Sequence, residues 1–406
     1  MSLSNKRKLI IIEELGDIKA SAAIANWNLS KIIGENFKNV DILTLDNIAP
    51  YIINQWHFGK VYVHPYKNLN KFQNYIHKKL RILNTLFQIF KGNDFNHCNR
   101  IINIRFFLNK NKQKYDSILC LSGGIGFATH QAISKIEFDK NVSLAGVFHD
   151  PYPGSSYPEP YRGGNRKYDY FRRKNLQKAI NKMNHLIFPS KKLYDWYLND
   201  YSIEKEKVSI IPHAVDFITK RRVEKKNKKV FKVTHAGTLL KPRNPKVFLK
   251  AFVENSSKDL FLDFYGPIHE VVYKDISPFK DQKNIHILNQ RISYELAQQK
   301  LLESDFMLLI ESDAINSPFL PTKFVEYVVI GLPIIVLTSP NSEVARLLGN
   351  NYPFISELNN NELISEILKE RIKNQKCIKD AMLILKGLKG YFSKENIIRS
   401  YKLIIK

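Results

Sequence analysis

The residues best placed to do chemistry are Lys323 and Glu326, in the stretch SPFLPTKFVEYVVIGLPIIVLT between Ser317 and Thr338. A spacing of three puts the ammonium and the carboxylate on one face of a helical turn. A cation beside a helix N-terminus predicts an anion site, and the neighbouring carboxylate can accept hydrogen bonds from a diol. The alternative is a buried helix–strand pair that carries a weak surface ion pair. This stretch alone does not decide between the two.

The local sequence sets the bounds of that helix. Pro321 fixes the preceding loop, and Thr322 is expected to cap the helix with its hydroxyl. The helix then runs from Lys323 to about Ile330 and stops at Gly331.

A second cation, Arg243, follows the turn Gly237-Thr238 in the segment GTLLKPRNP. If Arg243 and Lys323 share one site, two cations and a helix N-terminus form a receptor for a diphosphate without a metal. No Asp-x-Asp pair with metal-ligand placement stands out in the sequence. The alternative for Arg243 is a solvated loop arginine.

His149 and Asp150 follow a buried strand that is predicted over residues 142–148. Ligands of open parallel sheets bind beyond the carboxyl ends of the strands. An exposed His-Asp pair at that point is expected to orient a substrate hydroxyl or to handle a proton. The alternative is a turn stabilised by the aspartate side chain.

The elements that must position these residues alternate between short apolar strands and helices in both halves of the chain. A chain of 406 residues favours two domains. Strands are expected at residues 9–15, 40–45, 117–121, 142–148, 185–189 and 208–211, and again at 231–235, 260–265, 285–288, 306–310 and 334–337. The fold class is therefore α/β. The glycines at 123, 124 and 126 are interpreted as a strand-to-helix turn.

The net charge of +25 is partly concentrated between residues 51 and 114. This segment contains nine Lys and three Arg but a single acidic residue, Asp94. Apolar residues recur at helical spacing between Phe72 and Phe90, beside lysines and an arginine. This pattern is typical of a basic helix that lies on a membrane, or of an ordinary helix with a solvated basic face. The basic run at 218–229 has no apolar period and is expected to be a linker.

The expected compartment is the cytoplasm, with peripheral association on the inner face of the cell membrane. No apolar run approaches the roughly 20 residues that span a bilayer. Glu13 and Glu14 interrupt the first apolar run, so it does not read as a signal peptide. Three scattered cysteines indicate a reducing compartment and no metal cluster.

Four segments together resemble the retaining glycosyltransferases of GT-B fold, close to glycosyltransferase family 4. They are HAGTLLKPRNPKVFLKAF, SPFLPTKFVEYVVIGLPIIV, IPHAVD and the terminal FSKENIIRSYKLIIK. The resemblance is clear from about residue 185 onward. It implies two Rossmann-like domains that face each other across a cleft: an acceptor domain at 1–217, a linker at 218–229, a nucleotide-sugar domain at 230–390, and a terminal helix at 391–406 that crosses back to the first domain.

The resemblance also implies roles for the donor-binding residues. Arg243 and Lys323 would bind the donor diphosphate, and Glu326 the ribose hydroxyls. Gly237 and Thr238 would line the approach to the phosphates.

The remaining implied contacts are to the sugar. Backbone amides around Phe319 and Leu320, in the loop that ends at Thr322, would contact it. His149 and Asp150 would face it from the other domain.

Two departures from the family pattern concern the sugar and the phosphates. Pro318 stands where the family often has the first glutamate of a Glu-x7-Glu pair, and Gly237-Thr238 stands in place of a common Gly-Arg. They leave the identity of the sugar open and keep an inactive relative as an alternative.

The expected function is that of a retaining hexosyltransferase in cell-surface polysaccharide biosynthesis. It would move a sugar from a nucleoside diphosphate to a glycan or lipid-linked acceptor, without a metal or another cofactor. The alternatives are a basic nucleic-acid-binding protein that uses the aromatic side chains of residues 51–114, and a catalytically inactive GT-B scaffold.

Overall fold

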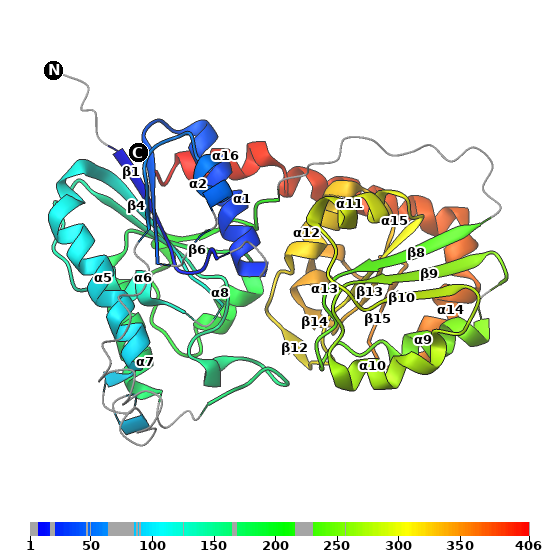
Figure 1. Cartoon of the computed structure of the whole chain (residues 1–406). Coiled ribbons are helices and arrows are strands. Elements are labelled where there is room, and N and C mark those ends of the chain that lie inside the picture. The colour runs from blue at the N-terminus through cyan, green and yellow to red at the C-terminus, as the bar shows by residue number, and fades with distance from the viewer. Residues whose placement is uncertain are drawn as a thin grey trace. The chain divides into compact units, whose positions relative to one another are not determined.

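The computed structural model describes residues 7–16, 21–45, 48, 50–63, 85–86, 88, 91–124, 126–164, 169–215, 230–255 and 257–405. The chain divides into two compact units (Figure 1). Unit 1 comprises residues 1–157, 161–215 and 394–406, and unit 2 comprises residues 158–160 and 216–393. Each unit has its own parallel sheet with helices packed on it, which confirms the predicted α/β class.

The sheet of unit 1 has seven described strands in the order β3-β2-β1-β4-β5-β6-β7, and all its pairings are parallel. The strands are β1 (Arg7–Ile12), β2 (Val40–Thr44), β3 (Val61–Val63), β4 (Tyr115–Leu121), β5 (Ser143–Val147), β6 (His185–Phe188) and β7 (Val208–Ile210). The helices are α1 (Ser21–Asn36), α2 (Pro50–Asn54), α5 (Phe95–Asn111), α6 (Ala128–Ile133), α7 (Tyr170–Lys182), α8 (Lys191–Tyr197) and α16 (Lys394–Lys402).

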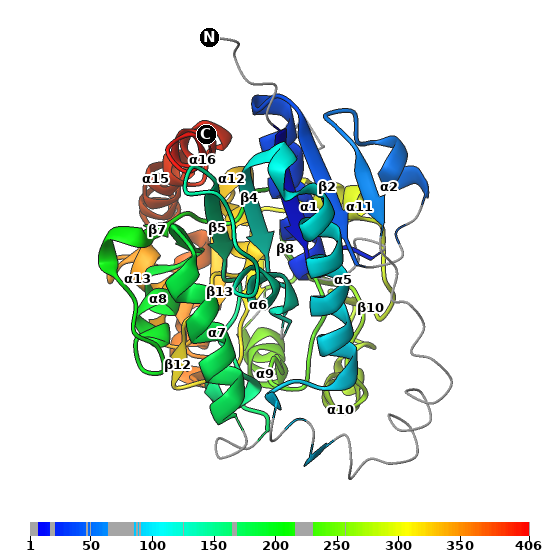
Figure 2. The same cartoon turned by 90° about the vertical axis from the view of Figure 1, so that its left-hand side faces the viewer.

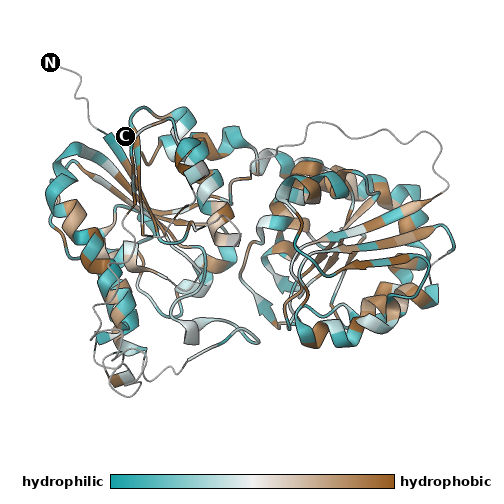
Figure 3. Ribbon diagram, in the orientation of Figure 1, coloured by the Kyte–Doolittle hydropathy of each residue, from teal (hydrophilic) through white to brown (hydrophobic). Residues whose placement is uncertain are grey.

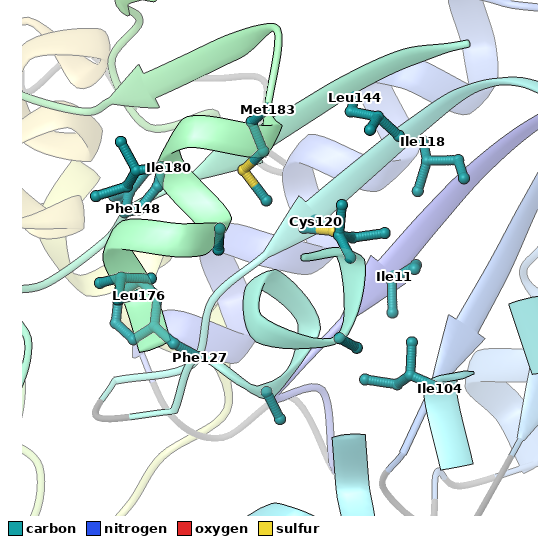
Figure 4. Packing of buried hydrophobic residues seen from close by; sticks show 14 of the residues in the cluster. Ile11, Ile104, Ile118, Cys120, Phe127, Leu144, Phe148, Leu176, Ile180 and Met183 are labelled. Atoms are coloured by element: carbon teal, nitrogen blue, oxygen red, sulfur yellow. The ribbon is translucent and has the colours of Figure 1, made fainter. Parts of the chain in front are cut away.

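Both faces of this sheet are buried. Successive side chains of a strand point to opposite sides, and alternate residues of β1 belong to two different apolar clusters. Leu9 and Ile11 of β1 belong to a cluster that includes residues of α5, α6, α7 and α8, part of which is drawn in Figure 4. Ile10 and Ile12 belong to a second cluster, formed with α1, the region of α2, and α16. Two buried faces explain why the strands read as continuous apolar runs, which are brown in Figure 3.

The C-terminal helix α16 is part of unit 1. Ile397 and Tyr401 lie in the second cluster. The Ser143 hydroxyl donates to the carbonyl of Ile404 at 2.9 Å, and Lys394 pairs with Glu35. The last helix therefore completes the face of the sheet that α1 covers.

Unit 2 has a six-stranded parallel sheet in the order β10-β9-β8-β11-β13-β15, and β12 pairs separately with β14. The strands are β8 (Phe231–Ala236), β9 (Leu260–Tyr265), β10 (Ile285–Leu288), β11 (Phe306–Ile310), β12 (Asn316–Ser317), β13 (Ile334–Leu337), β14 (Asn341–Ser342) and β15 (Ile355–Ser356). The helices are α9 (Lys246–Asn255), α10 (Glu270–Ile276), α11 (Tyr294–Leu302), α12 (Thr322–Ile330), α13 (Glu343–Leu348), α14 (Asn361–Lys369) and α15 (Gln375–Tyr391). Helix α9 packs against α10 and α14, and α12 packs against α15.

Two local predictions are wrong. The first strand covers Arg7–Ile12 rather than residues 9–15, because Glu13 leaves the strand to bind groups elsewhere in unit 1. Thr322 does not cap α12. It is the first residue of the helix, and Pro321 occupies the cap position without a side-chain hydrogen bond. The predicted end is confirmed: Gly331 has a φ of +79°, and its amide donates to the carbonyl of Tyr327.

Parts of the basic segment and of the linker cannot be compared with the structure. The predicted basic helix between Phe72 and Phe90 lies outside the described residues, apart from 85, 86 and 88, and so does the whole segment 218–229. Across the described parts of the chain, no helix has the length and apolar character that crossing a membrane requires.

Candidate functional site

In unit 2, the loops after β8 and β11 bring Lys323 to the glycine turn. The Lys323 ammonium donates to the carbonyl of Ala236, the last residue of β8. A Cβ atom added to Gly237 would overlap Cε of Lys323 and would lie 3.0 Å from its Nζ atom. Only a glycine at this position lets the lysine side chain lie across the turn.

A second glycine brings the neighbouring strand end close. Gly266, after β9, has a φ of +130°, and a Cβ atom there would overlap the Gly237 carbonyl oxygen. The Gly237 amide donates to the Tyr265 carbonyl at 2.8 Å. The two backbones are therefore packed directly against each other beneath Lys323.

The charges around Lys323 explain its electrostatics. Burial lowers the pKa of the Lys323 ammonium, the nearby Glu326 carboxylate opposes this, and Arg243 lowers it further. Arg243 therefore lies near enough to Lys323 for its charge to act on the ammonium. Because Lys323 is held by a backbone carbonyl in a desolvated position, the alternative of a solvated surface ion pair with Glu326 is wrong.

Glu326 is buried on α12, with 6 % of its surface exposed. Gln298 of α11 donates a hydrogen bond to its Oε1 atom at 3.1 Å. Thr238 and Phe319 are half-buried. Leu320 is buried, so its side chain packs in the interior and only its backbone is suited to contact a ligand.

Glu311 is a residue that the sequence analysis missed. It directly follows β11 and is buried, and it accepts hydrogen bonds from the hydroxyls of Thr338 and, at 3.2 Å, Ser317. Burial raises the pKa of its carboxyl, and the hydrogen bonds and Arg243 oppose that rise. Glu311 thus anchors the loop that leads into α12. Its place directly after a buried strand was the available signal.

In unit 1, His149 is buried rather than exposed, with 7 % of its surface accessible. Its Nε2 atom lies 2.7 Å from Asn26 Oδ1. The Asn26 amide nitrogen donates to the carbonyls of Glu14 at 3.0 Å and Ser122 at 3.1 Å, which fixes the amide so that its oxygen faces the ring. His149 must therefore carry its proton on Nε2.

The pKa values of His149 and Asp150 are shifted in opposite directions. Burial, with contributions from His213 and His130, lowers the pKa of His149 well below its usual value, so the ring is neutral at pH 7. Burial and the nearby Glu14 raise the pKa of Asp150 to about 7. The predicted exposed His-Asp pair is thus wrong: the imidazole bonds Asn26 and is buried, while Asp150 lies beside the glycine turn.

The glycine turn after β4 lies against the carboxylates of Asp150 and Glu14. A Cβ atom added to Gly124 would lie 3.8 Å from Asp150 Oδ2, and the Gly124 amide donates to Glu14 Oε2 at 3.2 Å. Glu13 accepts from the Thr129 amide of α6 and pairs with Arg100, both at 2.9 Å. Acidic and imidazole side chains therefore gather at the carboxyl ends of β1, β4 and β5. Among the residues that the structure describes, no group of three or more His, Cys, Asp or Glu side chains is placed to hold a metal ion.

Comparison with known proteins gives one family and a common fold. Residues 98–217 match the family model described as Glycosyltransferase Family 4. No curated protein sequence matches the chain.

Similar solved structures cover almost the whole chain. Anabaena HepE in complex with UDP and glucose is 13% identical, with a TM-score of 0.64 and 98% of each chain covered. A glycosyltransferase from Rickettsia africae is 14% identical, with a TM-score of 0.65 and 98% of each chain covered. Sucrose-phosphate synthase from Thermosynechococcus elongatus is 11% identical, with a TM-score of 0.67 and the same coverage. The segment 98–217 is therefore similar to glycosyltransferase family 4, and the whole chain has the GT-B fold of these solved structures.

Proposed function

We propose that this glycosyltransferase is a retaining hexosyltransferase that moves a sugar from a nucleoside diphosphate to a glycan or lipid-linked acceptor without a metal. The observation that carries the proposal is the Lys323 ammonium laid across Gly237, next to Arg243. HepE was solved with UDP and UDP-glucose, and Staphylococcus aureus TarM with UDP. A uridine diphosphate sugar is therefore the first donor to test.

The cations act on the leaving group. When the sugar–phosphate bond breaks, negative charge develops on the diphosphate, and fixed positive charge stabilises it. Lys323 uses one of its three donor positions on the Ala236 carbonyl, which leaves donors for phosphate oxygens. Arg243 and the N-terminal amides of α12 add to the same attraction.

The groups of unit 1 act on the sugar. A neutral His149 with its proton on Nε2 has an acceptor at Nδ1, which suits a sugar hydroxyl as donor. Asp150, with a pKa of about 7, is partly protonated at neutral pH and is able to donate or accept a hydrogen bond there. Glu326 is proposed to accept hydrogen bonds from the ribose, as implied by the family resemblance.

Helix α5 supports peripheral binding to an anionic membrane surface on the cytoplasmic side. Ile102 and Phe106 are each 58% exposed on α5, and the Lys110 ammonium lies 4.2 Å from the centre of the Phe106 ring. Figure 2 shows α5 on the outside of unit 1. Apolar side chains flanked by cations are typical of helices that lie on anionic lipid. Such an association would bring the protein to a lipid-linked acceptor, as we propose for the synthesis of a cell-surface polysaccharide.

The test is thermal stabilisation of the full chain by UDP, GDP, ADP, CMP and TDP, with and without magnesium. We expect one diphosphate to raise the Tm without magnesium, and Lys323→Met to abolish that shift. Lys246→Met is the matched control, because Lys246 pairs with Asp275 on the surface of the same unit. No shift with any nucleotide, together with salt-sensitive binding to oligonucleotides, would replace this proposal with a nucleic-acid-binding function.

A further inference from the structure

Unit 1 contains a cavity to which the proposed donor chemistry assigns no ligand. Its volume is about 580 Å³, and its lining includes Asn96, Arg100, Tyr157, Tyr161 and Arg172. It lies where α5, the turn after β4 and the loop after β5 meet. This volume is in the usual range for small-molecule sites.

The cavity borders the proposed reaction centre of unit 1. The Tyr157 hydroxyl donates to the Gly124 carbonyl at 3.2 Å, and Gly124 adjoins the carboxylate of Asp150. Glu13 and Gly126, from the strand end and the same glycine turn, also line the cavity. A ligand in it would therefore lie next to the groups that we propose to contact the transferred sugar.

The charges that line the cavity compensate one another. Arg100 pairs with Glu13 at 2.9 Å, and Arg172 pairs with Asp169 at 2.8 Å. Asp94 accepts a hydrogen bond from the backbone amide of His97 at the start of α5. Because both arginines already face carboxylates, the lining lacks the excess positive charge that a phosphate or carboxylate ligand needs.

The remaining lining suits a sugar. Tyrosine offers a flat apolar face for the C–H side of a sugar ring and a hydroxyl for a hydrogen bond. Asparagine and paired arginine side chains supply planar donors and acceptors for several hydroxyls. We propose that this cavity is the acceptor subsite and that it holds an uncharged saccharide unit. This inference rests on the proposed function, since it assigns the acceptor of that reaction.

The test is saturation-transfer NMR on the full chain with lactose and maltose as neutral probes, and glucuronate and glucose 6-phosphate as charged ones. We expect transfer to the neutral sugars, and Tyr161→Ala to weaken their binding about tenfold. Tyr170→Ala is the matched control, because Tyr170 is an exposed tyrosine of the same unit outside the cavity lining. Asn96→Ala and Asn99→Ala form a second pair on α5, of which only Asn96 lines the cavity.

The subsite would be overturned if Tyr161→Ala and Asn96→Ala bound the neutral sugars as tightly as the wild type does. It would also be overturned if the wild type showed no transfer to the neutral sugars. Tighter binding of either charged probe would overturn the uncharged class. The Tm shift with nucleotide is measured on the same variants and should match that of the wild type. A failed sugar experiment with an intact nucleotide shift removes the acceptor subsite alone, whereas a lost nucleotide shift in the wild type removes the proposed function.

Discussion

The two units place opposite chemistry on the same kind of scaffold. In unit 2, cations converge on a glycine turn at the end of β8. In unit 1, carboxylates and neutral imidazoles gather at the ends of β1, β4 and β5. Both are carboxyl ends of parallel strands, so the sheet supplies only the position. The few residues that follow each strand decide whether that edge carries cations or carboxylates and neutral imidazoles.

The largest effect is expected from Gly237→Ala, which tests the cationic side of this comparison. The new methyl group would lie where Lys323 Cε now lies, so the lysine must move. We expect kcat/KM to fall about 100-fold, as when one transition-state donor is lost. Gly387→Ala is the control, because an added Cβ there meets nothing within 4 Å.

A double-variant cycle decides whether the glycine acts through the lysine. If it does, Gly237→Ala combined with Lys323→Met should be no slower than Lys323→Met alone. Fully additive losses would show that Gly237 contributes in some way unrelated to Lys323.

An intermediate effect is expected from Asn26→Asp, which perturbs the neutral side. The carboxylate keeps the acceptor facing His149 Nε2 but adds a negative charge, so the pKa of His149 should rise. NMR titration of the ring measures that rise, and we expect kcat to fall about tenfold with nucleotide affinity unchanged. An unchanged titration would contradict the hydrogen bond on which the tautomer assignment rests.

The prediction for Asp150→Asn concerns the dependence of stability on pH rather than turnover. The folded-state pKa of Asp150 is raised, so the folded protein favours the protonated carboxyl. The favourable contribution is complete below the unfolded-state pKa and is lost as the pH rises through about 7. An asparagine side chain at this position cannot ionise, so between pH 5 and pH 8 the variant should lose about 2–3 kcal/mol less unfolding free energy than the wild type.

Urea unfolding at both pH values measures this difference. Glu14→Gln provides a companion, because Glu14 contributes to the raised pKa of Asp150. Without that neighbouring charge the pKa of Asp150 should move toward its ordinary value, and the variant should lose less stability between pH 5 and pH 8 than the wild type. Parallel stability curves for wild type and Asp150→Asn would show that the surroundings of Asp150 do not disfavour its charged form.

The sequence was sufficient for the features set by neighbours along the chain. The apolar runs of the two sheets, the helix that ends at Gly331 and the strand Ile334–Leu337 follow from burial on both faces and from one left-handed glycine. These signals are local, so they are visible without a fold.

Features set by distant partners were not predictable. Glu13 is buried because Arg100 and the amide of Thr129 reach it, and both lie far along the chain. His149 is buried against Asn26, 123 positions earlier. Helix α5 was missed because its lysines and asparagines obscure its apolar face. In each case the deciding contact exists only once the sheet has formed.

The packing of α16 has a consequence for how the chain folds during synthesis. The apolar cluster on one face of the first sheet needs Ile397 and Tyr401, which leave the ribosome after all of unit 2. Until then that face stays partly uncovered, although its strands are already made. Unit 2 consists of residues 216–393 and the short upstream segment 158–160, all of which are made before residue 394, so it is able to reach its native contacts first. Unit 1 is therefore able to complete its fold only after α16 has been synthesised. A nascent protein stalled before residue 394 would present an apolar surface to chaperones.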